Sequence, residues 1–239
     1  MYEKELLLGS EHVDCFRRMR TSELFKLLQT VSIRHTEQLG MGRDKTLDRG
    51  LLWVVTRMHV ELTRKPEYDE TVTVRTWPGE TMHLLFPRYY EIAAQDGSVI
   101  VRASAVWSLM DVEKRSAVFP EEYGVAIEGE ENGRELPWLV PVKPLETTRA
   151  DVFRVPYSYV DINGHLNNAR YLDLAEDRIE AASRGDLLKS VTAEYNREVR
   201  LGEELQIAIG ADDNSYYVAG TAEQPCFRLK LVFEEEKEK

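Results

Sequence analysis

The chain has 239 residues, and 42 acidic against 31 basic side chains give a formal net charge of −11. A hydrophobic share of 43% supplies a sizeable core, which excludes wholesale disorder, and the negative charge argues against a general nucleic-acid binder. No apolar run is long enough to span a membrane, and no secretory signal is evident. The two cysteines provide neither a disulfide framework nor a four-ligand metal site. We therefore expect a cytoplasmic protein without a bound metal.

The first 110 residues are predicted to form one helix followed by strands. An extended segment at 2–8 precedes a helical pattern whose apolar stripe runs from Leu24 to Leu39. Thr21 or Ser22 is the expected N-cap, and Gly40 is the expected stop. Runs rich in apolar and β-branched residues then predict four strands, at 51–62, 70–77, 82–93 and 98–110.

The second half repeats this order after a connector. Residues 111–150 hold four of the nine prolines and no sustained period, which is typical of a linking segment with short ordered pieces. Residues 151–233 then give an extended segment, a helix with the stripe Tyr171 to Ile179, and four strands. We expect these pieces at 153–160 for the extended segment and at 188–198, 203–210, 215–222 and 226–233 for the strands. The charged residues 234–239 are predicted to be a solvated tail.

The two halves also match residue by residue. A shift of 147 places Asp14 on Asp161 and the first helix on the second. A shift of 133 aligns a second group of charged side chains: Glu61 with Glu194, Arg64 with Arg197, and Glu70 with Glu203. The repeat predicts a duplicated unit of one helix and a mainly antiparallel sheet, which is an α+β architecture. Each helix is expected to bury its apolar stripe against its own sheet.

The densest polar cluster is 161–168, with the sequence Asp-Ile-Asn-Gly-His-Leu-Asn-Asn. If the backbone were extended here, Asp161, Asn163 and His165 would point to one side. Asn167 or Asn168 could cap the second helix, whose free N–H groups would face developing negative charge. A histidine, a carboxylate and oxyanion donors are what acyl transfer needs. The residues alone fit a polar turn with a helix cap equally well.

This motif, continued by Tyr171 and by Glu-Tyr-x-Arg-Glu at 194–198, resembles the acyl-acyl-carrier-protein thioesterases of plants and bacteria. The runs Leu-Trp-Val-Val-Thr-Arg-Met at 52–58 and Arg-Thr-Trp-Pro at 75–78 resemble the same family. The resemblance covers nearly the whole chain. It implies two tandem hotdog domains, each one long helix wrapped by a curved antiparallel sheet. It also implies cofactor-free hydrolysis of fatty acyl-carrier-protein thioesters, which ends or diverts fatty acid synthesis.

The resemblance assigns roles to four residues, Asp161, Asn163, His165 and Glu198, which fall on the family's catalytic positions. The next position is cysteine in plant members but Val199 here, and valine cannot attack a thioester. Glu198 is therefore expected to activate a water or, as the alternative, to attack directly. Asn163 would hold water or substrate, and Asp161 would orient His165. Backbone N–H groups at Leu166 or Asn167 are expected to stabilise the oxyanion.

The resemblance further implies that the first half forms the acyl pocket. The expected substrate-binding residues, each of which fits an ordinary core position equally well, are Leu28, Val31, Trp53, Val55 and Met58, with Asn167 from the second half. The partner would be acyl carrier protein, which holds the acyl chain on phosphopantetheine and is acidic in this family. Its predicted basic docking surface consists of Arg17, Arg18, Arg20 and Arg170. Monomer and homodimer both remain open.

Two other functions stay open from the sequence. A hotdog dehydratase or hydratase would use a similar histidine and carboxylate without releasing the thiol. A non-catalytic acyl-binding protein would keep the pocket and would not need Glu198. The sequence does not decide acyl length, or the choice between carrier protein and coenzyme A.

Overall fold

The computed structural model describes residues 1–130, 137 and 139–235. Its strands are β1 (Tyr2–Leu7), β2 (Leu51–Leu62), β3 (Thr71–Pro78), β4 (Phe86–Ala93), β5 (Val99–Asp111), β6 (Ser116–Ala117), β7 (Arg149–Arg154), β8 (Leu187–Tyr195), β9 (Glu204–Asp212), β10 (Ser215–Thr221) and β11 (Pro225–Glu234). Its α-helices are α1 (Thr21–Gln38), α2 (Arg170–Glu176) and α3 (Glu180–Arg184). The predicted element order therefore holds in both halves.

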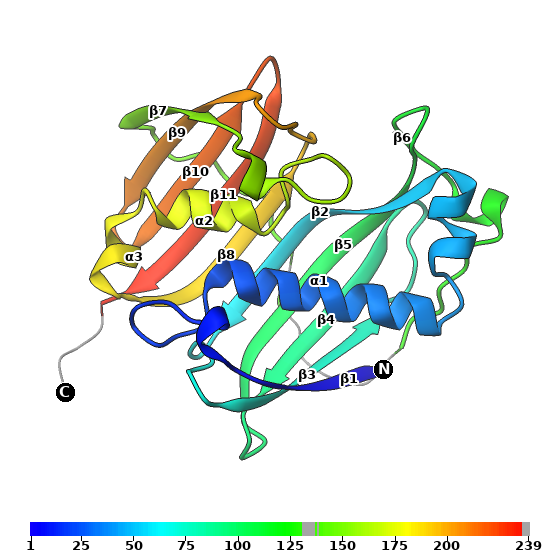
Figure 1. Cartoon of the computed structure of the whole chain (residues 1–239), viewed down its shortest axis with the longest axis horizontal. Coiled ribbons are helices and arrows are strands. Elements are labelled where there is room, and N and C mark those ends of the chain that lie inside the picture. The colour runs from blue at the N-terminus through cyan, green and yellow to red at the C-terminus, as the bar shows by residue number, and fades with distance from the viewer. Residues whose placement is uncertain (131–136, 138, 236–239) are drawn as a thin grey trace.

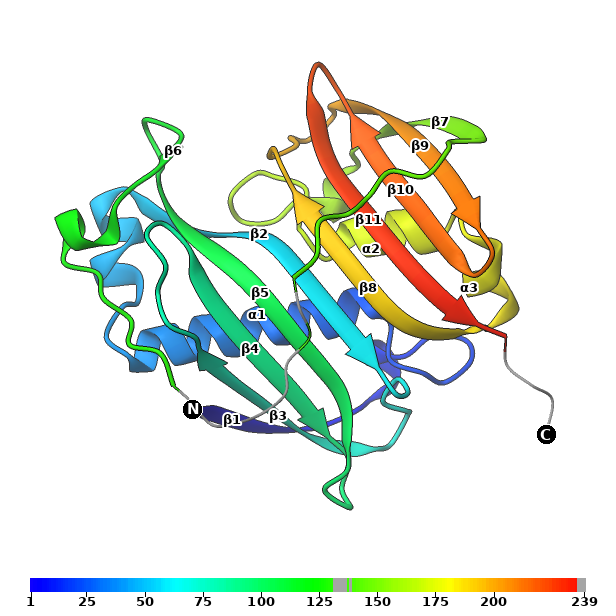
Figure 2. The ribbon, with the colours of Figure 1, turned by 180° about the vertical axis from the view of Figure 1, so that it is seen from behind.

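The strands form one antiparallel sheet in the order β1-β3-β4-β5-β2-β8-β11-β10-β9-β7, with β6 paired to β5. The two halves meet where β2 pairs with β8, in a register that sets Arg57 opposite Glu194. Helix α1 lies over the first half of the sheet, and α2 and α3 lie over the second (Figure 1). Seen from behind, the chain that leads to β7 crosses the other face of the sheet (Figure 2).

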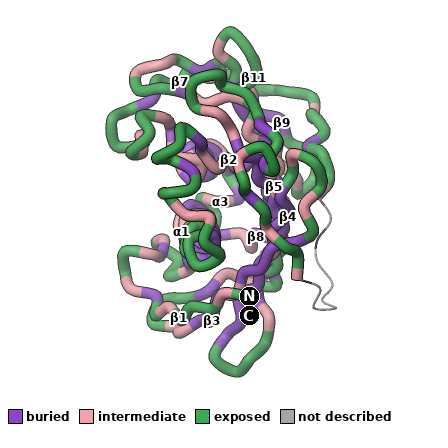
Figure 3. Tube along the Cα trace, turned by 90° about the vertical axis from the view of Figure 1, so that its right-hand side faces the viewer, coloured by how far each residue is buried: buried purple, intermediate pink, exposed green. Residues whose placement is uncertain are grey.

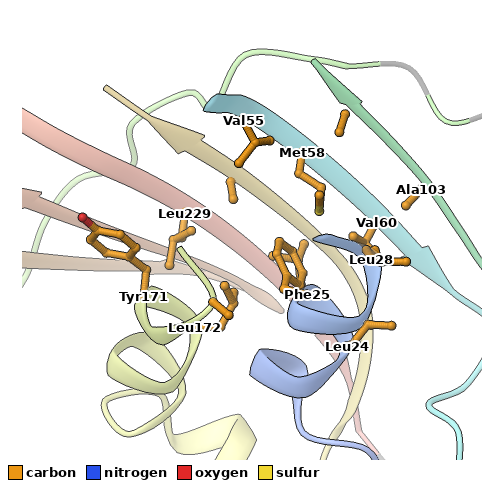
Figure 4. Packing of buried hydrophobic residues seen from close by; sticks show 14 of the residues in the cluster. Leu24, Phe25, Leu28, Val55, Met58, Val60, Ala103, Tyr171, Leu172 and Leu229 are labelled. Carbon is orange, nitrogen blue, oxygen red and sulfur yellow. The ribbon is translucent and has the colours of Figure 1, made fainter. Parts of the chain in front are cut away.

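Helix α1 packs its apolar stripe onto the sheet from Leu24 to Val31, as its sequence period predicts, whereas Leu39 lies beyond the helix and is exposed. Leu24, Phe25 and Leu28 are at most 2% exposed, and they face Met58 and Val60 of β2 (Figure 4). Burying each such side chain stabilises the fold by roughly 1.5–3 kcal/mol. Figure 3 shows buried residues concentrated along the strands, while the loops are largely exposed.

The start of the first helix and the form of the second differ from the sequence expectation, whereas the first helix ends just before Gly40 as predicted. The N-cap of α1 is Arg20, without a side-chain cap, because Thr21 is already helical and its hydroxyl donates to Glu176 instead. The second helix is interrupted at 177–179, so the stripe from Tyr171 to Ile179 is divided between α2 and α3. The extended segment predicted at 153–160 is β7 at 149–154, followed by a 3₁₀ turn at Tyr157–Tyr159.

The predicted connector contains ordered pieces. After β5 it holds the short strand β6 and a 3₁₀ turn at Pro120–Tyr123. Its later part lies against the sheet, where the Ser104 hydroxyl donates to the carbonyl of Pro137 at 2.7 Å. Residues 131–136 and 138 of the connector, and 236–239 of the predicted tail, lie outside the described residues.

Candidate active site

A cavity of about 1060 Å³ lies between the two halves of the sequence. Trp53 and Val55 of β2 and Phe86 of β4 form part of its apolar wall. The second half of α1 contributes polar groups such as Thr36. The segment that leads into α2 and the residues that follow β8 complete the lining with Asp161, Asn163, His165, Asn167 and Glu198. The cavity thus joins a long apolar wall to the polar motif.

The motif at 161–168 folds as a tight turn, and its backbone is not extended over 161–165. Gly164 adopts a φ of 78°, which a side chain would disfavour, and its N–H donates to the Asp161 carbonyl at 3.0 Å. The Asp161 carboxylate accepts the N–H of Asn163 at 2.8 Å. A bridge between Val160 and Leu166 closes the turn. The turn nevertheless brings Asp161, Asn163 and His165 to one cavity.

Glu198 lies beside this turn. The N–H of Leu166 donates to the carbonyl of Val199 at 2.7 Å, and His165 forms a bridge with Arg200. These backbone contacts bring the Nε2 atom of His165 to 3.4 Å from the Oε2 atom of Glu198. The two side chains are 17% and 23% exposed, so both are partly shielded and still reach the cavity. At this separation the histidine and the carboxylate lie just beyond direct hydrogen-bond reach, and one bridging water or a small side-chain movement would let a proton pass between them.

Arg115 also contacts Glu198, and sequence reasoning missed it. Its Nη2 atom donates to the same Oε2 atom. Arg115 follows a tight turn after β5, in which the Asp111 carboxylate accepts the N–H groups of Glu113 and Lys114. These bonds, foremost that from Lys114, hold the pKa of Asp111 below its usual value. Arg115 lies in the aperiodic connector, 83 residues from Glu198, so no local pattern links the two.

The backbone donors predicted for the oxyanion are already bonded. The Leu166 N–H binds Val199, and the Asn167 N–H donates to the carbonyl of Tyr159 at 2.9 Å. The side chain of Asn167 accepts the N–H of Ala169 at 3.0 Å, so it shapes the start of α2, although Ala169 rather than either asparagine is the N-cap. The N–H groups of Leu166 and Asn167 are therefore not free to stabilise an oxyanion, contrary to the expectation for these two positions.

The predicted pocket residues fall into two groups. Trp53 and Val55 line the cavity. Leu28, Val31 and Met58 are at most 1% exposed, belong to the core cluster and are not part of the cavity lining. The ring of Trp53 packs edge-on against Phe86, another lining residue, with centroids 4.7 Å apart. The aromatic pair therefore forms a firm section of the wall.

The predicted carrier-binding arginines lie in two places. Arg17, Arg18 and Arg20 precede α1, whose other end contributes Thr36 to the cavity, and 18 helical residues span about 27 Å. Arg170 begins α2 directly after the turn at 161–168; it stacks on Tyr159 and pairs with Asp173 at 2.7 Å. Of the four arginines, Arg170 is therefore the one that adjoins the motif along the chain.

Glu194, the other glutamate of the second signature, has structural partners. It is 5% exposed, lies 2.8 Å from Nη2 of Arg57 and accepts the N–H of Val142 at 3.1 Å. It therefore ties β2, β8 and the connector together. Among the described residues there is no cluster of three or more acidic, histidine or cysteine side chains that could hold a metal ion. None of the described helices is long and apolar enough to cross a membrane.

Two family models cover most of the chain. The acyl-ACP thioesterase N-terminal domain matches residues 1–124, and the acyl-ACP thioesterase C-terminal domain matches residues 142–238. An acyl-[acyl-carrier-protein] hydrolase of Cuphea viscosissima is 25% identical over 88% of this chain and 55% of its own length. The palmitoyl-acyl carrier protein thioesterase of Arabidopsis thaliana is 26% identical over 96% of the chain and 61% of its own length. The chain thus spans little more than half of these relatives.

Solved structures share the fold over nearly their full length. An acyl-ACP thioesterase from Bacteroides thetaiotaomicron superposes with a TM-score of 0.84 at 24% identity, covering 98% of this chain and 97% of that one. The 12:0-ACP thioesterase from Umbellularia californica gives a TM-score of 0.80 at 19% identity over the same shares. The predicted α+β fold with tandem hotdog halves is confirmed.

Proposed function

Because the chain belongs to the acyl-ACP thioesterase family, we propose that it hydrolyses fatty acyl thioesters carried by acyl carrier protein, releasing free fatty acid and the carrier thiol. One observation carries this proposal: the contact between His165 and Glu198, 3.4 Å apart, at the polar end of a large, partly apolar cavity. An acyl chain can occupy such a cavity while its thioester lies beside a base and a proton donor.

The proposed reaction begins with a water beside Glu198. The carboxylate accepts a proton from this water, whose oxygen attacks the thioester carbonyl carbon. His165 and the side-chain amide of Asn163 stabilise the charge that develops on the carbonyl oxygen, because no free backbone donor is present at Leu166 or Asn167. The carbon–sulfur bond then breaks, and the proton held by Glu198 returns through His165 to the leaving sulfur.

Asp161 and Arg115 act as positioning residues in this scheme. The Asp161 carboxylate binds the backbone of Asn163, so it holds the turn rather than the histidine ring. Arg115 binds the same oxygen of the Glu198 carboxylate that His165 contacts. Val199 is fully buried and its carbonyl binds Leu166, which agrees with a mechanism in which water rather than a thiol attacks.

The partner in this proposal is acyl carrier protein, with its acyl chain on phosphopantetheine. Arg170, next to the catalytic turn, is the predicted docking residue closest in sequence to the motif, while Arg17, Arg18 and Arg20 would require a footprint extending to the other end of α1. A cytoplasmic location is part of the proposal, since Cys15 and Cys226 are both free thiols. If the carrier protein docks at Arg170, Arg170→Glu should raise KM for carrier thioesters and leave KM for coenzyme A thioesters unchanged.

The test is free-thiol release from a series of acyl-carrier-protein and acyl-coenzyme A thioesters. We expect carrier-bound medium or long chains to be cleaved, with turnover lowered at least ~100-fold in Glu198→Gln. A dehydratase or hydratase would change the acyl chain without releasing thiol. A silent binding protein would retain acyl chains and give no product in either assay. Either result would overturn the hydrolase proposal.

A further inference from the structure

A buried cation lies in the cavity wall away from the catalytic turn. Arg88 of β4 is 4% exposed and belongs to the lining. Its guanidinium donates to Nδ1 of His35 at 3.1 Å, to the hydroxyl of Thr36 at 3.1 Å and to the hydroxyl of Thr76 at 3.4 Å. All three partners are neutral acceptors. Burial lowers the pKa of His35 to about 4, and the charge of Arg88 acts in the same direction, so the imidazole is uncharged near neutral pH.

No carboxylate pairs with Arg88 among residues 1–130, 137 and 139–235. Tyr90 and then Glu130 favour its protonated form. Burial raises the pKa of the Tyr90 phenol, which therefore stays uncharged near neutral pH. The Glu130 carboxylate is itself bound to the amino group of Met1 and is 37% exposed. Residues 35 and 36 lie in the last turn of α1, whose dipole offers a cation only partial compensation. A buried cation without a paired anion is costly, since burial removes its hydration. Arg88 therefore has unused capacity to bind an acceptor.

More polar groups surround this end of the cavity. The Ser32 hydroxyl lies 2.7 Å from the Tyr90 hydroxyl, which accepts the indole N–H of Trp107 at 3.3 Å. Ser32, Thr36 and Trp107 all line the cavity. An interior that served only hydrocarbon would hold fewer such groups. The wall thus changes from apolar side chains around Trp53 to hydrogen-bonding groups around Arg88.

The cation is remote from the reacting groups. Arg88 lies on β4, and Glu198 follows β8; three strand intervals separate these strands in the sheet order β4-β5-β2-β8. At ~4.8 Å per interval this is roughly 14 Å across the sheet. A group that meets Arg88 must therefore lie far along an acyl chain whose thioester is at Glu198.

We propose that the Arg88 end of the cavity is a binding site for an oxygen acceptor near the far end of the acyl chain, so that the preferred substrates are chains with a remote hydroxyl, oxo or carboxylate group. This inference rests on the proposed function, because it takes the thioester to bind beside Glu198. Arg88 donates to the remote oxygen and supplies the positive charge. An unsubstituted chain of the same length instead sets methyl and methylene groups against a cation, which costs binding free energy.

The test compares matched substrates on one enzyme. Thiol release is measured for carrier thioesters from octanoyl to hexadecanoyl, each as the plain, the ω-hydroxy and the ω-carboxy chain. We expect the polar-ended chain to have a kcat/KM at least about tenfold higher than its plain counterpart at the lengths that reach Arg88. In Arg88→Met, which keeps an unbranched side chain and removes the charge, this ratio should fall to near one. The same change at Arg75, a β3 residue paired with Glu3 outside the cavity lining, should leave the ratio as in wild type.

A binding measurement separates failure of this inference from failure of the proposed function. Non-hydrolysable amide analogues of the same chains are titrated against the fluorescence of Trp53 and Trp107, which both line the cavity. If thiol is never released but ω-hydroxy or ω-carboxy analogues bind at least about tenfold tighter, the site stands and the hydrolase proposal falls. If plain chains are preferred or equal at every length in both assays, the inference is wrong, whatever the variants do. Because wild type alone gives this answer, a variant that does not fold leaves the test intact.

Discussion

The turn before α1 and the turn before α2 have the same backbone design and different side chains. In the first, the N–H of Arg17 donates to the carbonyl of Asp14 at 3.0 Å; in the second, Gly164 donates to Asp161 at the same distance. Each aspartate carboxylate accepts the N–H two residues further on, at 2.9 and 2.8 Å. Arg17 even adopts a φ of 64°, close to the 78° of Gly164. The duplicated unit has therefore kept its turn geometry without keeping its sequence.

The segments that pack against these turns correspond as well. Met19 donates to the carbonyl of Pro66 at 2.8 Å, as Leu166 donates to Val199 at 2.7 Å. An arginine–glutamate pair supports each segment, Arg64 with Glu70 and Arg197 with Glu203. These bonds stabilise the framework in both halves. They do not by themselves create a site.

The chemistry depends on a few side chains and on what faces them. The second half has Asn163, His165 and Glu198 beside a cavity; the matching positions of the first half hold Phe16, Arg18 and Lys65. There the space is occupied: Phe16 packs at Gly185, Arg18 donates to the carbonyl of Gly185 at 2.6 Å, and Lys65 lies 3.5 Å from Glu176. In the first half, the residues at the equivalent positions therefore contact the helices of the second half and hold them next to α1. One framework thus serves packing in one half and the proposed catalysis in the other.

The largest effect should come from removing the proton carrier of the second half. His165→Gln keeps a hydrogen-bonding side chain but cannot pass a proton, so thiol release should fall about 100-fold. His59→Gln is the control, because His59 binds Thr192 outside the cavity lining and should keep wild-type turnover. Equal losses in the two variants would mean that the His165 effect is structural.

A smaller loss is expected where Glu198 loses its second partner. Arg115→Gln should lower kcat about tenfold with little change in KM, because the Oε2 atom of Glu198 then keeps only its contact with His165. Arg115→Lys keeps the charge and should restore part of the loss. If the glutamine and lysine variants behave alike, the ion pair does not position Glu198.

Substitutions at the two matching aspartates, Asp14 and Asp161, should distinguish an effect on stability from an effect on activity. Asp14→Ala and Asp161→Ala each remove a carboxylate that accepts backbone N–H groups, two for Asp14 and one for Asp161. Urea unfolding should show that each substitution lowers the free energy of unfolding by about 1–2 kcal/mol, with the larger decrease for Asp14→Ala. Thiol release from the folded enzyme should fall severalfold for Asp161→Ala alone, since Asn163 loses its support. An equal fall in Asp14→Ala would contradict the division of roles between the halves.

The smallest effect concerns the backbone of the turns. A Cβ atom at Gly164 would meet nothing within 4 Å, so Gly164→Ala should lower the free energy of unfolding by about 1 kcal/mol through its positive φ alone. Arg17→Gly relieves the same strain in the first half but also increases the conformational freedom of the unfolded chain. The free energy of unfolding should therefore change by no more than about 0.5 kcal/mol. A destabilisation by Gly164→Ala well above 2 kcal/mol in urea unfolding would point to a contact that the empty space does not provide.

Elements with a regular period could be predicted from the sequence. Helix α1 was expected from its stripe of leucines, and β2 was expected at its observed residues 51–62. The repeat is predicted from matched charged residues, among them Glu70 and Glu203. In the structure these two glutamates support matching turns. The local periodicity of the sequence indicates which face of a helix or strand is buried, and it does so without knowledge of what packs against that face.

The features that were not predicted depend on contacts between distant residues or on a special backbone. The sequence left open whether 161–165 is extended or a turn, and the turn forms because Gly164 permits a positive φ. Arg115 and Arg88 were missed because each is identified by its neighbours rather than by its own pattern: Glu198 in one case, His35 and Thr36 in the other. The roles of the proposed catalytic residues remain predictions until they are assayed.

The most direct measurement sets the two halves against each other at one matched position. Glu198→Gln and Lys65→Gln each neutralise the charge at the same place in the repeated framework. Measured side by side for free-thiol release from acyl-carrier-protein thioesters, Glu198→Gln should lose at least ~100-fold in turnover while Lys65→Gln stays within about twofold of wild type. Retained turnover in Glu198→Gln, or an equal loss in both variants, would contradict the assignment of catalysis to the second half.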